Sequence, residues 1–265
     1  MITTNLLGTT EARKVIDKKG RFSVIEYDKD MSVTPEDAET AYFSAQMNIR
    51  KRQVVAELDE DHGAIVQSGA MQLMIGQLHA ATNIKGAGDL MKKFIGSKVT
   101  GESTIKPRYI GNGLLVLEPT YKYIILEDVL DWEGRLVVED GMFLACDDSV
   151  NMSVTARKTF SSAVLGNEGL FNTAMSGSGI AVLESPVPRE ELIEVNLDKD
   201  VLRIDGNMAI AWSSTLEFTV ERTTATLVGS AASGEGLVNV YRGTGRVLLA
   251  PVANNWNIAT PKVTK

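Results

Sequence analysis

Short apolar runs separated by turn residues make up most of the chain from about residue 52 to residue 251. The runs are rich in β-branched and aromatic residues and end at Gly, Asp or Asn, which is typical of strands. We therefore expect strands over Val54–Leu58, Ala64–Gln67, Met71–Ile75, Ile124–Leu126, Leu136–Val138, Met142–Ala145, Leu192–Val195, Val201–Ile204 and Met208–Trp212. Acidic turns should separate the first two runs of each group, at Asp59–Gly63, Asp131–Gly134 and Asp198–Asp200.

A glycine-rich stretch occurs three times, at Gly111–Pro119, Gly177–Ser185 and Gly243–Pro251, with its second glycine recurring every 66 residues. A fixed long period indicates internal repetition. Each stretch leads into an apolar run, so we expect a tight hairpin turn at the glycines, with Gly236–Leu249 as the clearest instance. A phosphate-binding loop is disfavoured, because no Lys-Ser/Thr follows the glycines and no helix begins there.

A second set of glycines, Gly69, Gly141 and Gly206, follows the second run of each group and predicts a bend, a bulge or a positive φ. The copies extend over 52–119, 124–185 and 193–251, which we expect to form a single domain. Neither terminal copy resembles a polar cap, so we favour three copies closed around a pseudo-threefold axis over an extended stack.

The two ends of the chain fall outside this pattern. Residues 1–51 are expected to form an extension with one strand, Phe22–Tyr27, and a short helix over about Pro35–Ala45. Thr34 would be the N-cap of this helix and Pro35 its first residue. Residues 252–265 form a polar tail.

Composition limits the classes of function. The chain has 265 residues, a net charge of −7 and 44% hydrophobic residues. The acidity argues against binding of nucleic-acid backbones, which need Lys and Arg. A single cysteine, no apolar run of about 20 residues and no signal-peptide pattern favour a cytoplasmic protein.

Several motifs match a known family. Gly166–Asn172 followed by Gly177–Gly179, and Gly234–Asn239 followed by Gly243–Leu249, resemble the signature of the altered-inheritance-of-mitochondria (Aim, TRAP-like) family, and the chain is similar to its bacterial members. The resemblance implies an all-β fold of three repeats, similar to the subunit of the trp RNA-binding attenuation protein, with short helices in the connections. It implies no enzymatic activity, catalytic residue or cofactor. Pro107, before the first glycine stretch, departs from the family pattern.

A repeated glutamate, at Glu102, Glu168 and Glu235, is the most regular polar set. One interpretation is a ring of three carboxylates that binds a cation or a partner. We favour the other, in which each carboxylate accepts hydrogen bonds from backbone N–H groups of its glycine-rich turn. For His62, in the acidic turn, and for Cys146, we expect a solvated turn and a buried, inert thiol rather than metal ligands.

These observations favour a non-enzymatic scaffold that binds protein, through self-association or an unknown partner. Contact with a membrane surface stays open, through an apolar stripe of Leu90, Met91, Phe94 and Ile95. The alternative is a module that binds a small ligand or nucleic acid, by analogy with the attenuation protein. Fold alone does not decide between them.

Overall fold

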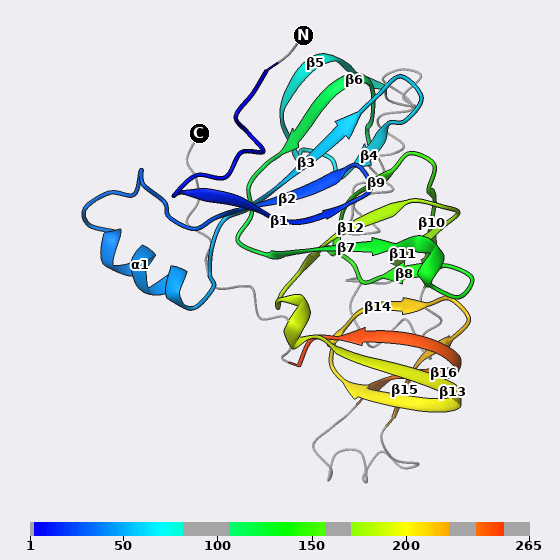
Figure 1. Ribbon diagram of the computed structural model, residues 1–265. Coiled ribbons are helices and arrows are strands. Elements are labelled where there is room, and N and C mark those ends of the chain that lie inside the picture. The colour runs from blue at the N-terminus through cyan, green and yellow to red at the C-terminus, as the bar shows by residue number, and fades with distance from the viewer. Residues whose placement is uncertain (1–2, 82–105, 157–170, 223–236, 252–265) are drawn as a thin grey trace, which may run out of the picture. The chain divides into compact units, whose positions relative to one another are not determined.

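The computed structural model describes residues 3–81, 106–156, 171–222 and 237–251 (Figure 1). Within these ranges the chain forms sixteen strands, one α-helix, α1 (Ala38–Gln46), and two short 3-10 helices, η1 (Val129–Asp131) and η2 (Arg189–Glu191). The predicted all-β class is confirmed.

The chain divides into two compact units. The first consists of Met1–Val129, Phe143–Asn151 and Gly177–Ser185. Its sheet has the strand order β1-β2-β3-β6-β4-β9-β12-β7, and β5 pairs with β6 beside this path. These strands are β1 (Arg13–Lys19), β2 (Phe22–Tyr27), β3 (Arg52–Leu58), β4 (Ala64–Val66), β5 (Met71–Ala81), β6 (Arg108–Leu117), β7 (Tyr123–Asp128), β9 (Phe143–Asp147) and β12 (Ile180–Ser185).

The second unit consists of Leu130–Met142, Met152–Ser176 and Pro186–Lys265. Its sheet has the order β10-β11-β8-β14-β16-β13, with β15 paired to β16 beside this path. The strands are β8 (Leu136–Val138), β10 (Asn151–Ala156), β11 (Phe171–Ser176), β13 (Ile193–Asp205), β14 (Ala209–Ser213), β15 (Glu217–Arg222) and β16 (Leu237–Leu249). The expected second copy, 124–185, therefore contributes strands to both units.

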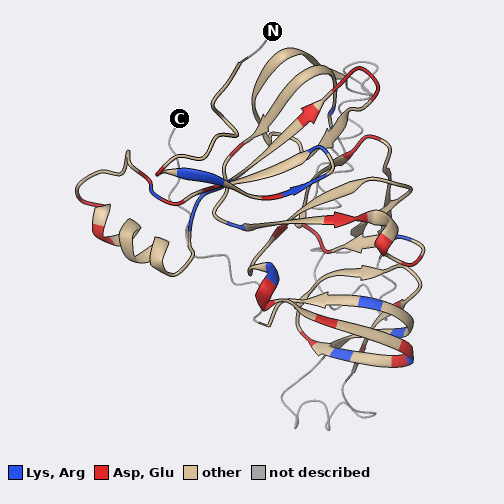
Figure 2. Cartoon of the chain, viewed as in Figure 1, with Lys and Arg blue, Asp and Glu red and all other residues tan. Residues whose placement is uncertain are grey.

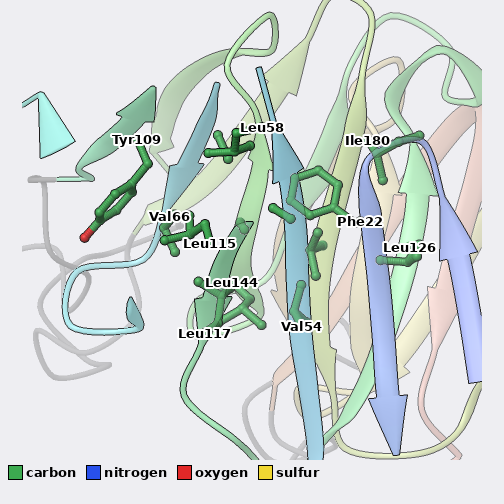
Figure 3. Packing of buried hydrophobic residues seen from close by; sticks show 14 of the residues in the cluster. Phe22, Val54, Leu58, Val66, Tyr109, Leu115, Leu117, Leu126, Leu144 and Ile180 are labelled. Carbon is green, nitrogen blue, oxygen red and sulfur yellow. The ribbon is translucent and has the colours of Figure 1, made fainter. Parts of the chain in front are cut away.

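Each unit has its own hydrophobic core. In the first, Phe22, Val54 and Leu115 lie among a cluster of buried side chains (Figure 3). Burial of one such side chain contributes about 1.5–3 kcal/mol. In the second, the rings of Trp212 and Tyr241 meet edge to face with centroids 5.4 Å apart, and Phe218 lies 5.0 Å from Tyr241. Such aromatic pairs stabilise a core beyond their buried area.

The predicted glycine hairpins are wrong. β6 continues through Gly111 and Gly113, and β16 through Gly243 and Gly245, as single strands. The glycines do have positive φ, +114° and +157° in β6. A Cβ on Gly111 would lie 2.1 Å from the carbonyl oxygen of Gln77 on the paired strand. These glycines therefore permit a close approach of two backbones within a sheet, which is a second use of glycine in strands.

The second glycine stretch, Gly177–Gly179, is a bend between β11 and β12. β11 pairs with β8 in one sheet, while β12 pairs with β7 and β9 in the other. The bend therefore carries the chain from one sheet to the next, and does not close a hairpin.

The predicted turn at Asp198–Asp200 is also wrong, because β13 runs through it. A β-bulge between Leu197 and Asp200 accommodates the extra residue, and Lys199 has a φ of +53°. The Lys199 N–H donates to Thr244 Oγ1 over 3.1 Å. An acidic cluster thus marks a bulge here, where the twist of the strand increases.

Other local predictions are confirmed. Gly69, Gly141 and Gly206 all have positive φ, +83°, +76° and +70°. The predicted strand Phe22–Tyr27 is β2. It lacks alternation because both of its faces are covered: Phe22 and Val24 pack in one hydrophobic cluster and Ile25 packs in another.

The N-terminal region differs in two details. An additional strand, β1, pairs with β2 where the sequence predicted only a polar extension. The helix begins at Ala38, and Asp37 is its N-cap, so Thr34 does not cap it. The Asp37 N–H donates to the Thr34 carbonyl oxygen over 3.1 Å. Thr34 and Pro35 therefore form a turn that precedes the helix.

Candidate functional site

The carboxylates predicted from repetition, Glu102, Glu168 and Glu235, lie outside the described residues, as do the apolar residues Leu90, Met91, Phe94 and Ile95. The carboxylate ring, its alternative and the membrane-contacting stripe stay predictions. The structure instead directs attention to surfaces on described strands and on α1.

His62 lies in a hydrogen-bonded turn. Its Nδ1 is 2.8 Å from Asp59 Oδ1, and both side chains are exposed. The hydrogen bond from His62 lowers the pKa of the Asp59 carboxyl. Among the described residues, no three His, Cys, Asp or Glu side chains are grouped so that they could hold a metal ion. The other histidine, His79, is exposed on β5.

Cys146 is fully buried on β9. Burial strongly raises the pKa of its thiol, and the neighbouring carboxylate of Asp147 adds to this. A thiol reacts as its thiolate, so Cys146 is protonated and unreactive at neutral pH.

The strands that follow Gly69, Gly141 and Gly206, namely β5, β9 and β14, share one construction. β5 pairs with β6, β9 with β12 and β14 with β16, all antiparallel. Each strand carries a β-bulge shortly after the glycine, and the extra residues are Gln72, Leu144 and Ile210. The bulge is a marker that aligns the three strands residue by residue. No residue type in the sequence predicted this bulge.

Two of these strands are also paired along their other edge. In the first unit, Ile65 of β4 lies opposite Cys146 of β9. In the second, Val137 of β8 lies opposite Trp212 of β14. Cys146 and Trp212 are each the second residue after their bulge. The β4·β9 and β8·β14 pairings, which we call joints, therefore have the same register.

β5 differs from its two counterparts. Among the described residues it pairs with β6 alone. The first two residues after its bulge, Leu73 and Met74, are 39% and 40% exposed. The corresponding residues on the paired strands are at most 3% exposed, namely Ala145, Cys146, Ala211 and Trp212. β5 therefore presents apolar surface at the positions that a neighbouring strand covers elsewhere.

The composition of β5 does not protect this edge. Its eleven residues, Met71–Ala81, include no Asp, Glu, Lys, Arg or Pro, and the strand is without charge in Figure 2. β1, at the end of its sheet, instead carries Arg13, Lys14, Lys18 and Lys19. Natural proteins protect edge strands with such charges or with proline. We therefore define the outer edge of Met71–Ala81 as the β5 edge.

A second open edge lies on β13. Residues Val201–Asp205 pair on one side with Val238–Arg242 of β16. Within the described part of the chain no other strand pairs with β13. Val201 is 37% exposed, whereas the equivalent β4 and β8 residues, Ala64 and Leu136, are fully buried. We call this segment the β13 edge.

A third surface is the exposed helix α1, none of whose residues is buried. Tyr42 and Phe43 are 61% and 59% exposed, and their rings lie 5.4 Å apart. Figure 1 shows α1 set apart from the strands of the first unit. The helix and its flanks thus offer apolar side chains to solvent.

Ion pairs join the segments that precede and follow α1. Arg50 Nη1 lies 2.9 Å from Glu26 Oε1 and 2.7 Å from Asp28 Oδ1. Lys51 Nζ lies 2.5 Å from Asp30 Oδ2, which lowers the pKa of the Asp30 carboxyl and raises that of the Lys51 ammonium. The chain before α1 is therefore linked by ion pairs to the chain after it.

Arg52, the first residue of β3, extends this ion-pair network into the protein interior. Its side chain is 2% exposed, lies 2.7 Å from Glu26 Oε2 and stacks on the Tyr123 ring at 4.2 Å. It also donates to Asn48 Oδ1 over 2.8 Å. A buried charge needs this many partners to offset its desolvation, so the group is structural.

Comparisons with known proteins agree with the fold. A family model described as "Mitochondrial biogenesis AIM24" matches residues 43–252. An uncharacterized protein of Streptococcus pyogenes serotype M6 is 29% identical over 205 residues, covering 74% of this chain and 80% of that protein.

A crystal structure of a Streptococcus pyogenes protein superposes with a TM-score of 0.58. It covers 78% of this chain and 90% of that one at 24% identity. At this identity the likeness supports the fold alone. In the described residues, no helix is long and apolar enough to cross a membrane.

Proposed function

We propose that this chain, which belongs to the mitochondrial biogenesis AIM24 family, is a non-enzymatic scaffold that binds protein through the β5 edge. One observation carries this proposal: an eleven-residue, uncharged strand is paired on one side only among the described residues. An open strand edge binds extended segments by β-augmentation, with main-chain hydrogen bonds supplying the affinity.

We further infer that residues 52–251 are three copies of one β unit. The three positive-φ glycines, the bulge after each of them and the equal registers of the β4·β9 and β8·β14 joints support this. The expected pseudo-threefold closure requires a third joint, between the β13 edge and the β5 edge of one chain. It stays a prediction and is the alternative to protein binding at the β5 edge, because it would occupy that edge within one chain. An intrachain cross-link between the two edges would establish the closure and exclude the proposal.

A photoreactive amino acid in place of Met74 tests the scaffold function. Irradiation in an extract of the source cells should give covalent protein adducts, and mass spectrometry identifies the captured segment. The matched control places the same group at Val154, which is 57% exposed on β10. Adducts at position 74 alone, through an extended segment, support the proposal. Equal capture at both positions, or no capture at position 74, would overturn it.

A further inference from the structure

The β5 edge and the β13 edge are the two halves of one missing joint. The observed joints follow one rule for the glycines Gly69, Gly141 and Gly206. The strand before one of these glycines pairs with the strand after the next of them, as β4 with β9 and β8 with β14. The β13 edge precedes Gly206, and β5 follows Gly69. Continuing the series places the β13 edge against β5.

The register of this pairing follows from the observed joints. Ile65 and Val137 each lie four positions before their glycine and face the second residue after a bulge. The equivalent residues are Leu202, four positions before Gly206, and Met74, two positions after Gln72. The pairs are therefore Leu202 with Met74, Val201 with Ile75 and Arg203 with Leu73.

Exposure supports the same match. At the observed joints the paired residues are covered, as for Cys146 at 0% and Trp212 at 3% exposure. At the two candidate edges the corresponding residues of the described part of the chain are exposed, Met74 by 40% and Val201 by 37%. The side chains that would meet are mostly apolar, and the antiparallel sense is the one found at both existing joints.

We propose that the β5 edge of one chain pairs with the β13 edge of a second copy. This inference rests on the proposed scaffold function, because it names the occupant of the same edge. Each chain offers one edge of each kind, so the contact is head-to-tail. Repetition of such a contact gives a ring if the rotation closes and an open filament if it does not.

Cysteine cross-linking between separate chains tests this pairing. Met74→Cys and Leu202→Cys are made in different chains, which are mixed and oxidised. The native Cys146 is buried with a raised thiol pKa, so it does not compete. We expect a covalent dimer of twice 28.7 kDa that needs both variants. The control mixture pairs Leu202→Cys with Val154→Cys, since Val154 is exposed on a different strand.

The outcomes separate the possible occupants. A mixed dimer from Met74→Cys and Leu202→Cys, and not from the control mixture, supports the second copy. A chain that carries both Met74→Cys and Leu202→Cys is oxidised in parallel; if it forms only an intrachain disulfide, the edges close within one chain and the proposal is overturned. If no disulfide forms while the photoreactive group at position 74 captures another protein, the scaffold function stands and self-pairing fails.

Association in solution provides a second measurement that does not depend on disulfide geometry. Leu73→Lys places a charge in the covered joint and should weaken self-association roughly tenfold or more, as edge lysines do. Val154→Lys should leave it unchanged. Sedimentation equilibrium gives the association constant, and circular dichroism confirms that both variants fold. Equal association constants for the two variants would refute the pairing.

Discussion

At the scale of single residues, glycine has two separable roles in this fold. Gly111 has a φ of +114°, and a Cβ there would meet the Gln77 carbonyl oxygen at 2.1 Å. Gly69 has a φ of +83°, but a Cβ there would meet nothing within 4 Å. The first position forbids a side chain through contact and conformation, and the second through conformation alone.

This difference predicts unequal costs for one substitution. Gly69→Ala should destabilise the protein by about 1 kcal/mol, the strain of a positive φ. Gly111→Ala should cost about 3 kcal/mol or more, because β5 and β6 must also separate. Urea unfolding measures both. Equal losses would show that the close contact between the strands is not maintained in solution.

Cys146 makes stability depend on alkaline pH. Its pKa is raised from an ordinary value of 9.0 by burial, so above pH 9 the unfolded chain loses the thiol proton while the folded chain keeps it. The unfolded state then binds fewer protons, and stability falls as pH rises, by up to about 1.4 kcal/mol per pH unit from this group.

Cys146→Ala should therefore reduce the loss of stability between pH 8 and pH 10.5, even though it lowers stability at pH 8 by creating a small cavity. The comparison is between the pH slopes of the free energy of unfolding of the two proteins. Identical slopes would mean that the thiol is already accessible to base in the folded state.

At the scale of elements, α1 should be separable from the folding of the first unit. Phe43 is 59% exposed, whereas Phe22 on β2 is fully buried. Phe43→Ser should change the free energy of unfolding by less than about 0.5 kcal/mol, as for other surface positions. Phe22→Ala should cost about 3–5 kcal/mol. Thermal unfolding compares them, and a large loss from Phe43→Ser would mean that α1 packs onto the unit.

The elements also show what the sequence could and could not predict. Apolar runs located β2, β3 and β8 closely, because local composition decides strand formation there. Gly243-Thr244-Gly245 resembled a hairpin, since glycine favours both a turn and a close backbone approach. Only the pairing of β16 with the strands β13 and β14 distinguishes the two uses, and both strands are distant from these glycines in sequence.

The candidate site was predictable only in part. The lack of charge in Met71–Ala81 is visible in the sequence and would have marked an unprotected edge. That this edge is exposed depends on which strand pairs with which, and no local pattern carries that information. The glutamates Glu102, Glu168 and Glu235 drew attention through repetition, but they lie outside the described residues.

At the scale of the whole molecule, pairing between copies predicts that stability depends on protein concentration. If the β5 edge binds a second chain, assembly stabilises the folded state by mass action, and the melting temperature rises with concentration. A tenfold increase in concentration adds at most about 1.4 kcal/mol per contact. Leu73→Lys should melt at one temperature over the same range, while Val154→Lys should behave like the unmodified chain. A melting temperature that is independent of concentration in all three proteins, at concentrations where sedimentation shows monomers only, would mean that neither edge recruits a second chain.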